Sequence, residues 1–270
     1  MTSLIAAAAH AGSEDGAVLS ERGVMSASVR QTILCVAALA AGLGLASPAF
    51  AGPPFITDDP EPTDQGHWEI YTFTEGTHTP GDTAGEAGLD FNYGGAKNLQ
   101  LTAVIPAGYD NSSWGMGDVE LAAKYKFLHQ DGPAGLDVAV FPRVFLPTAF
   151  DRHGDRHASL LIPIWAQKDF GKWSVFGGGG YQINPGAGNR NFWISGLTVT
   201  RQLSERFMLG AEVYHQTADT DLGRDWTVVN LGGQVKMTKH WSLLVSGGPG
   251  VEHPREAGQS DFYLSLKADY

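Results

Sequence analysis

The densest group of chemically capable residues lies near the middle of the chain. The run Asp-Arg-His-Gly-Asp-Arg-His from Asp151 to His157 holds two histidines and two aspartates, donor types that bind transition metals. Arg152 and Arg156 would oppose a bound cation, so we interpret the run as a solvated external loop. No metal site is therefore expected, although the two arginines could contact phosphate groups.

A second candidate is the pair His157 and Ser159, which would share one face of a β-strand. A histidine beside a serine can activate the hydroxyl as a nucleophile, as in a lipid hydrolase built on a barrel wall. No carboxylate or amide is visibly placed to orient His157. We therefore expect no catalytic residues and no enzyme, and keep an outer-membrane lipid hydrolase as an alternative.

Two further motifs have weaker chemical meaning. The acidic run 57–61, Thr-Asp-Asp-Pro-Glu, could bind calcium, but we interpret it as an acidic periplasmic lead-in that could enter a barrel mouth. Gly177 to Gly180 resembles a phosphate-binding loop only in composition, because no Lys-Ser/Thr pair follows. Consecutive glycines in a strand more often permit curvature or close approach by another segment.

The composition excludes several classes of protein. A net charge of −11 leaves no basic surplus for binding nucleic acid. A mean hydropathy of −0.14 disfavours a multi-span helical membrane protein. Charged residues make up only 17% of the chain and glycine contributes 35 residues, which is atypical of a soluble enzyme.

The N-terminal region has the pattern of a secretory signal peptide. Arg30 precedes an apolar run from residue 33 to residue 45, and Ala49-Phe50-Ala51 follows. We expect cleavage after Ala51, a signal peptide at 25–51 and a mis-annotated upstream extension at 1–24. The mature chain then comprises a periplasmic N-terminal lead-in at 52–66 and an outer-membrane barrel at 67–270. It contains no cysteine, and no cofactor is expected.

Alternating hydrophobicity dominates the mature chain, whereas helical spacing is absent. From Val119 to Phe127, for example, apolar positions alternate with Glu120, Lys124 and Lys126. The pattern predicts twelve strands at 68–75, 86–93, 99–105, 119–127, 136–145, 160–168, 173–183, 191–201, 207–216, 226–237, 241–247 and 262–270.

These strands predict an all-β fold, a transmembrane antiparallel β-barrel with about twelve strands in an up-and-down meander. The strands have the length needed to cross a bilayer, and their number is even. Connections of about 3–7 residues alternate with connections of about 7–14 residues, as periplasmic turns alternate with external loops in such barrels. A soluble sandwich would show no such asymmetry.

Alternate residues of a strand point to opposite faces, and we assign the more polar set in each strand to the barrel interior. The expected pore-lining residues are Glu69, Glu86, Asp90, Glu120, Lys124, Lys126, Asp137, Arg143, Glu212, Asn230, Gln234 and Lys267. Twelve strands lie between barrels filled by side chains and barrels with a water channel, so the pattern leaves open whether this lumen is plugged. Because Glu120 faces inward, the pattern also predicts that Glu120→Arg is tolerated.

The strand ends and the C-terminus carry aromatic residues. We interpret those at strand ends as interfacial girdles: Trp68, Tyr93, Tyr109, Trp114, Phe127, Trp165, Phe170, Trp173, Phe192, Trp193, Phe207, Trp226, Trp241, Phe262 and Tyr270. In the last strand, Phe262, Leu264, Leu266 and Tyr270 lie on one face. This pattern resembles the signal by which outer-membrane barrels reach their insertion machinery.

Several segments resemble one protein family. They are Gly52 to Pro62, Gly66 to Glu69, Gly117 to Leu121 with Lys124-Tyr125, Phe141-Pro142, Leu146 to Thr148, Trp173 to Gly186 and His215 to Thr220. Together they are similar to outer-membrane proteins grouped as the MetA-pathway of phenol degradation family, often labelled "transporter". The resemblance extends over about the whole mature chain and implies an outer-membrane barrel. It brings no catalytic residues.

We therefore expect a channel in the bacterial outer membrane for passive passage of small solutes, with aromatic or hydrophobic solutes suggested only by the family label. The expected partners are outer-membrane lipids and lipopolysaccharide, the barrel-insertion machinery and small-molecule solutes, but not nucleic acid. Besides the lipid hydrolase, a sealed structural or adhesive barrel remains an alternative.

Overall fold

A computed structural model describes residues 54–149, 154, 156–252 and 259–270. The expected upstream extension and signal peptide lie outside the described residues, as do Asp151, Arg152, His153 and Asp155 of the ionisable run. No helix in the described part of the chain is long and apolar enough to cross a membrane.

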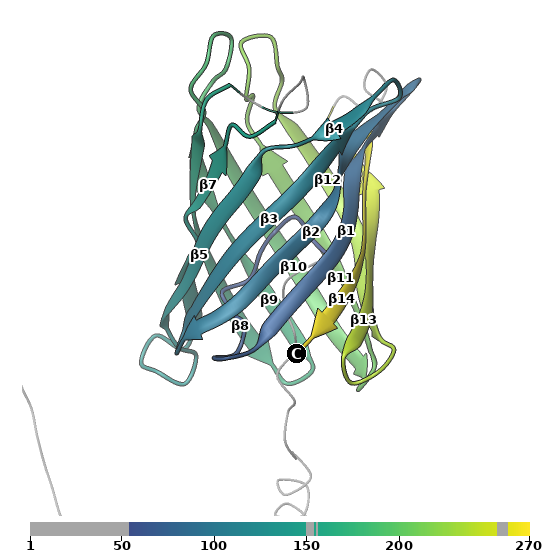
Figure 1. Cartoon of the computed structure of the whole chain (residues 1–270). Coiled ribbons are helices and arrows are strands. Elements are labelled where there is room, and N and C mark those ends of the chain that lie inside the picture. Colours follow the sequence, from purple (N-terminus) through teal and green to yellow (C-terminus); the bar gives the residue numbers. More distant parts are fainter. Residues whose placement is uncertain (1–53, 150–153, 155, 253–258) are drawn as a thin grey trace, which may run out of the picture. The chain divides into compact units, whose positions relative to one another are not determined.

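The described residues form antiparallel strands (Figure 1). Their bounds are β1 (Trp68–Thr79), β2 (Asp82–Ala96), β3 (Leu99–Tyr109), β4 (Trp114–Met116), β5 (Val119–Leu128), β6 (Asp137–Val140), β7 (Arg143–Leu146), β8 (Ser159–Phe170), β9 (Trp173–Ile183), β10 (Phe192–Ser204), β11 (Phe207–Gln216), β12 (Trp226–Lys236), β13 (Trp241–Pro249) and β14 (Ser260–Asp269).

The strands close into a barrel because the first pairs with the last, from Glu69 opposite Asp269 to His78 opposite Ser260. Strand β3 pairs with both β4 and β5, so β4 and β5 together form one wall strand. In the same way, β8 pairs with both β6 and β7, which together form another. The wall therefore has twelve strands in meander order, as the sequence predicts. The described wall therefore has no free sheet edge. In lipid, a protein built of strands needs this closure, because no water is present to bond unpaired backbone groups.

The break between β6 and β7 has a chemical cause in Pro142, which cannot donate a ladder hydrogen bond. Neighbouring strands still hold the wall together there. The Phe141 amide donates to the Pro163 carbonyl at 3.1 Å, and the Ala123 amide donates to the Pro142 carbonyl at 3.1 Å. The interruption therefore does not open the wall.

Side chains alternate between lipid and lumen, as β5 shows. Leu121, Tyr125 and Phe127 remain 45–49% exposed on the outside, whereas Glu120, Lys124 and Lys126 are buried inside the barrel. Other strands repeat this arrangement with outward leucine, isoleucine and valine. An apolar outer surface of this kind suits the hydrocarbon core of a membrane.

Some aromatic residues do lie outside near strand ends, including Trp68, Phe170, Trp173 and Tyr270. The girdle prediction is wrong for Trp165, which is buried inside the barrel. Phe192 and Trp226 also face inward, packed against buried apolar residues. Proximity to a strand end does not distinguish the two faces, whereas parity along the strand does.

The predicted lengths of two external connections are wrong, because the strands beside them extend farther than expected. Only Pro80 and Gly81 lie between β1 and β2, and Gly81 adopts φ of 90°, which glycine accommodates without strain. Only residues 110–113 lie between β3 and β4. In β1, β2 and β3 the hydrogen-bonded pairing continues past the last residue of the alternating hydrophobic pattern. The pattern therefore ends before the strand does.

Candidate transport path

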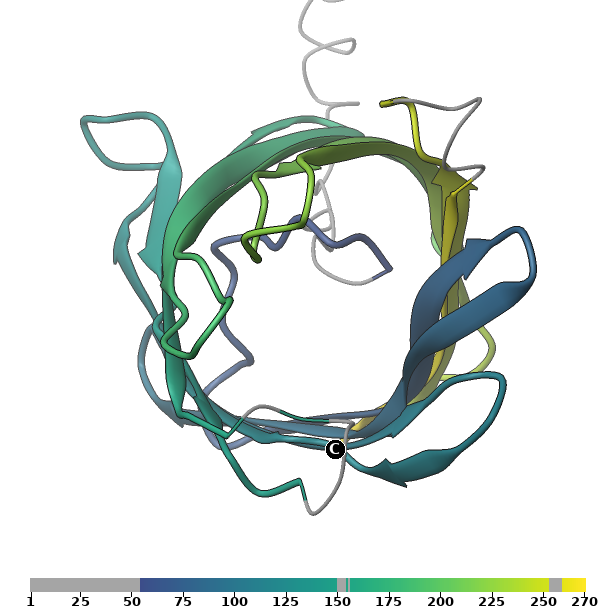
Figure 2. The same ribbon diagram turned by 90° about the horizontal axis from the view of Figure 1, so that it is seen from above.

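The lead-in, residues 54–66, lies inside the barrel and crosses its lumen before β1 begins (Figure 2). At one end, the Ser246 hydroxyl on β13 donates a hydrogen bond to the Pro54 carbonyl. Near the other end, the Thr63 amide donates to Gln100 Oε1 on β3 at 2.9 Å. The Gly66 amide then donates to the Gly94 carbonyl at 2.8 Å. The lead-in thus contacts separate parts of the wall.

Glu212 on β11 anchors the middle of the lead-in. Its Oε1 accepts a hydrogen bond from the Thr57 amide at 2.5 Å, and its Oε2 accepts from the Ile56 amide at 3.3 Å. Asn230 Nδ2 donates to the same Oε2 at 2.9 Å. A buried carboxylate needs such donors, so the lead-in backbone and Glu212 satisfy each other.

Three lumen-facing glycines on neighbouring strands make room for the lead-in. We call Gly196 on β10, Gly210 on β11 and Gly232 on β12 the glycine seat. A methyl group at Gly196 would overlap the Thr57 hydroxyl oxygen and lie 2.9 Å from Thr57 Cβ. Methyl groups at Gly210 and Gly232 would lie 2.9 Å and 3.0 Å from the Phe55 ring. Any larger residue in the glycine seat would therefore press on the lead-in.

Two lysines of β5 hold the acidic part of the lead-in. Lys124 Nζ lies 2.9 Å from Asp58 Oδ1 and 3.7 Å from Asp59 Oδ1. Lys126 Nζ lies 2.7 Å from Glu61 Oε1. Burial in the lumen raises the pKa of Asp59 to about 7, and the positive charge of Lys124 opposes that shift.

Other interior charges pair within the wall. Arg143 donates from Nε and Nη2 to the two oxygens of Glu120 at 2.7 and 2.8 Å, a bidentate arrangement. Lys267 Nζ lies 2.7 Å from Glu69 Oε1 and 2.9 Å from Asp269 Oδ1. These pairs neutralise part of the lumen.

Glu75, Glu86 and Asp90 remain without an ion-pair partner among the described residues. Glu75 and Glu86 lie directly opposite each other on β1 and β2, and all three acids line a central cavity. Like charges placed opposite each other are unfavourable unless solvent or a counterion screens them. This side of the lumen is therefore strongly acidic.

Cavities follow one another through the barrel. The central cavity measures about 270 Å³, and it shares Glu61, Glu69 and Tyr71 with a lower cavity of about 550 Å³ near the chain terminus. It shares Val104 and Glu120 with an upper cavity of about 430 Å³ below the long loops. The lead-in narrows the lumen but leaves space along the β1–β7 side of the barrel.

Two long loops lean over the upper mouth (Figure 2). The connection between β9 and β10 bonds the one between β11 and β12, since the Arg190 amide donates to the Asp219 carbonyl at 2.7 Å. The Asp221 amide returns a bond to the Gly188 carbonyl at 2.8 Å. These contacts hold the loops together at the upper opening.

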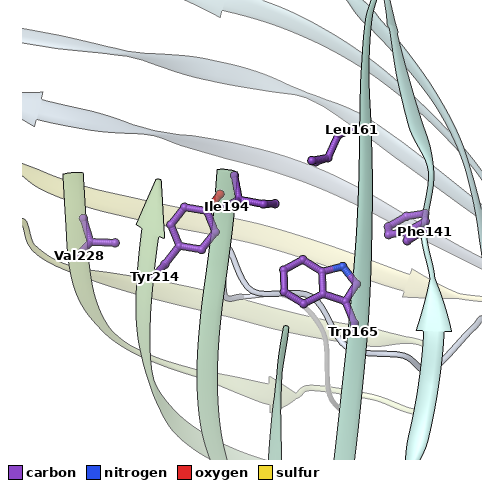
Figure 3. Packing of buried hydrophobic residues seen from close by; sticks show 6 residues of the cluster. All are labelled: Phe141, Leu161, Trp165, Ile194, Tyr214 and Val228. Carbon is purple, nitrogen blue, oxygen red and sulfur yellow. The ribbon is translucent and has the colours of Figure 1, made fainter. Parts of the chain in front are cut away.

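An apolar cluster lines the opposite interior wall, where neighbouring strands direct their side chains into the barrel (Figure 3). Its buried members are Phe141, Leu161, Trp165, Ile194, Tyr214 and Val228. Phe141 also lines the central cavity, as does Phe145, which packs against the cluster. Aromatic side chains therefore line the central cavity together with the acids, and they include Tyr71 and Phe73 on β1 itself.

The structure places all twelve residues expected to line a pore on the interior side of the wall. Most line the cavities, whereas Lys126 and Glu212 are buried against the lead-in and Asn230 is buried beside Glu212. Sequence reasoning missed Glu75, although its parity matches that of Glu69. It also missed the glycine seat, since nothing local identifies which glycines meet a distant segment.

The remaining motifs acquire structural explanations. Ser159 faces the interior, where its hydroxyl accepts a hydrogen bond from Gln182 Nε2 at 2.8 Å. Gly178 gives space to Trp165, whose ring would lie 3.1 Å from an added methyl group. Leu264, Leu266 and Tyr270 of the C-terminal pattern are exposed on the outer face.

A family model described as "Putative MetA-pathway of phenol degradation" matches residues 63–268. The chain belongs to this family. No curated protein sequence matches this member of the family.

Solved structures share the fold of this family member. An outer membrane channel from Pseudomonas putida F1 has a TM-score of 0.61 and 16% identity, over 78% of this chain and 97% of that chain. The KdgM porin has a TM-score of 0.53 and 11% identity, over 74% and 98% of the two chains. The NanC porin has a TM-score of 0.52 and 14% identity, over 73% and 98%. The family member thus has the fold of these outer-membrane β-barrels.

Proposed function

We propose that the barrel is a channel for passive passage of small solutes across the outer membrane. The observation that carries this proposal is the succession of three cavities that share lining residues from one end of the lumen to the other. The names of the similar structures, a channel and two porins, support it. The family description and the aromatic side chains that line the central cavity favour aromatic solutes.

The acidic side of the lumen suggests the preferred charge of the solute. Glu75, Glu86 and Asp90 lack basic partners among the described residues, so their negative potential attracts cations and repels anions. The channel should therefore pass cations and neutral solutes more readily than anions of the same size.

The alternatives have less support. A lipid hydrolase needs its nucleophile at the lipid surface, whereas Ser159 faces the lumen and bonds Gln182. Its hydroxyl makes no hydrogen bond to His157 within the described part of the chain. A sealed structural barrel would leave no succession of cavities beside the lead-in. Neither alternative explains the acidic route.

Outer-membrane lipids and lipopolysaccharide are the proposed surroundings, and the insertion machinery is the proposed partner during assembly. The outward residues Phe262, Leu264, Leu266 and Tyr270 support the second proposal, because they present an apolar face at the end of the chain.

Solute flux into proteoliposomes tests the channel proposal. Val104 lines both the central and the upper cavity, so Val104→Trp should block their junction and slow the flux of a phenol-sized solute. Ala103→Trp provides the matched control, because the adjacent side chain faces lipid. Equal flux through both variants, or no flux through the unmodified barrel, would contradict the proposal.

A further inference from the structure

The lead-in contributes no strand to the wall, yet it occupies the lumen through specific contacts. Thr57 is fully buried, and the amides of Ile56 and Thr57 both bond Glu212. Farther along, Lys124 and Lys126 hold Asp58 and Glu61. The amide bonds and the ion pairs fix the lead-in on two different sides of the lumen.

The glycine seat determines how closely the lead-in approaches the first of these sides. Gly196, Gly210 and Gly232 belong to consecutive strands, and each would contact Thr57 or Phe55 if it carried a methyl group. The next inward positions on β11 and β12 are Glu212 and Asn230, which form the hydrogen-bonding end of the same surface. The wall is thus shaped to receive Phe55, Ile56 and Thr57.

From these contacts we infer that the glycine seat and Glu212 set the pore size by holding the lead-in against β10–β12. The inference rests on the proposed channel function. Gly196 and Glu212 are positioning residues, because they act on the solute route through the lead-in. With the lead-in held at this wall, the route is confined to the space along β1–β7.

The substitution Gly196→Leu tests this inference by the direction of its effect. The leucine adds side-chain volume to the lumen, so it should leave conductance unchanged or lower it if the lead-in stays in place. If the leucine displaces the lead-in, the larger opening raises single-channel conductance instead. Ser195→Leu is the matched control, because the neighbouring residue is exposed on the outer face. It should conduct like the unmodified barrel.

A labelling experiment measures displacement without depending on conduction. The Thr57 hydroxyl makes no hydrogen bond within the described part of the chain, so Thr57→Cys removes none. In an otherwise unmodified barrel this buried thiol should resist a water-soluble maleimide. Combined with Gly196→Leu it should react, and combined with Ser195→Leu it should stay protected. Gly210→Ala provides a second variant should Gly196→Leu fail to fold. Its methyl group would lie 2.9 Å from the Phe55 ring and 2.7 Å from Thr200 Cγ2 on β10.

The outcomes separate this inference from the proposed function. Continued protection of the thiol in the glycine-seat variants, or unchanged or lower conductance in them, would overturn the inference and leave the channel proposal intact. Exposure of the thiol in barrels that never conduct would overturn the channel proposal, and with it the inferred control of pore size. Exposure together with higher conductance is the result expected.

Discussion

Leu121→Arg tests which face of the wall meets lipid. Leu121 lies on β5, where 47% of it is exposed on the outer surface between Ala103 of β3 and Val144 of β7. An arginine on the lipid face near the bilayer midplane costs about 2–4 kcal/mol of folding free energy. This cost corresponds to a decrease of about 30- to 1000-fold in the folding equilibrium constant.

Urea unfolding in lipid vesicles, followed by heat-modifiable gel migration, measures that loss. Glu75→Arg is the control, because it introduces the same side chain on the lumen face opposite Glu86. The control should fold with little change in stability. Equal losses of stability in the two variants would refute the assignment of faces.

Four further predictions follow from particular contacts. Glu86→Lys should lower the cation-to-anion permeability ratio in a salt gradient more than Asp82→Lys, since Glu86 lines the central cavity and Asp82 lies exposed at a turn. Arg143→Ala should lower the free energy of unfolding by about 1–3 kcal/mol in urea titrations, because Glu120 loses both donors. Removal of Tyr270 should reduce outer-membrane yield and heat-modifiable migration if the last strand is the assembly signal, and normal values would count against it. Intact mass of the exported protein should place its first residue at Gly52, whereas retention of residues before Ala51 would refute the cleavage prediction.

The alternation of side chains predicted most of the wall, because parity along a strand is a local property. It assigned Leu121 to the outer face and Glu120 to the lumen without knowledge of which strands pair. It could not reveal that β1 and β2 extend to Thr79 and Asp82, since their ladder continues where the hydrophobic pattern ends.

The contacts across the lumen could not be read from local sequence. Glu212 meets Thr57 only because the barrel closes and the lead-in turns inward. The same limit changes the expectation for Glu120→Arg, which the inward position alone predicts to be tolerated. Arg143 bonds both oxygens of Glu120, so the substitution would bring two guanidinium groups together. We therefore expect Glu120→Arg to destabilise the barrel.

Single-channel recording of the purified barrel in a planar bilayer tests the proposed channel most directly. The cavities beside the lead-in predict small, stepwise conductance, and the unpaired acids predict a reversal potential that favours cations in a salt gradient. A folded barrel that inserts but shows no conductance steps would contradict the proposed transport path.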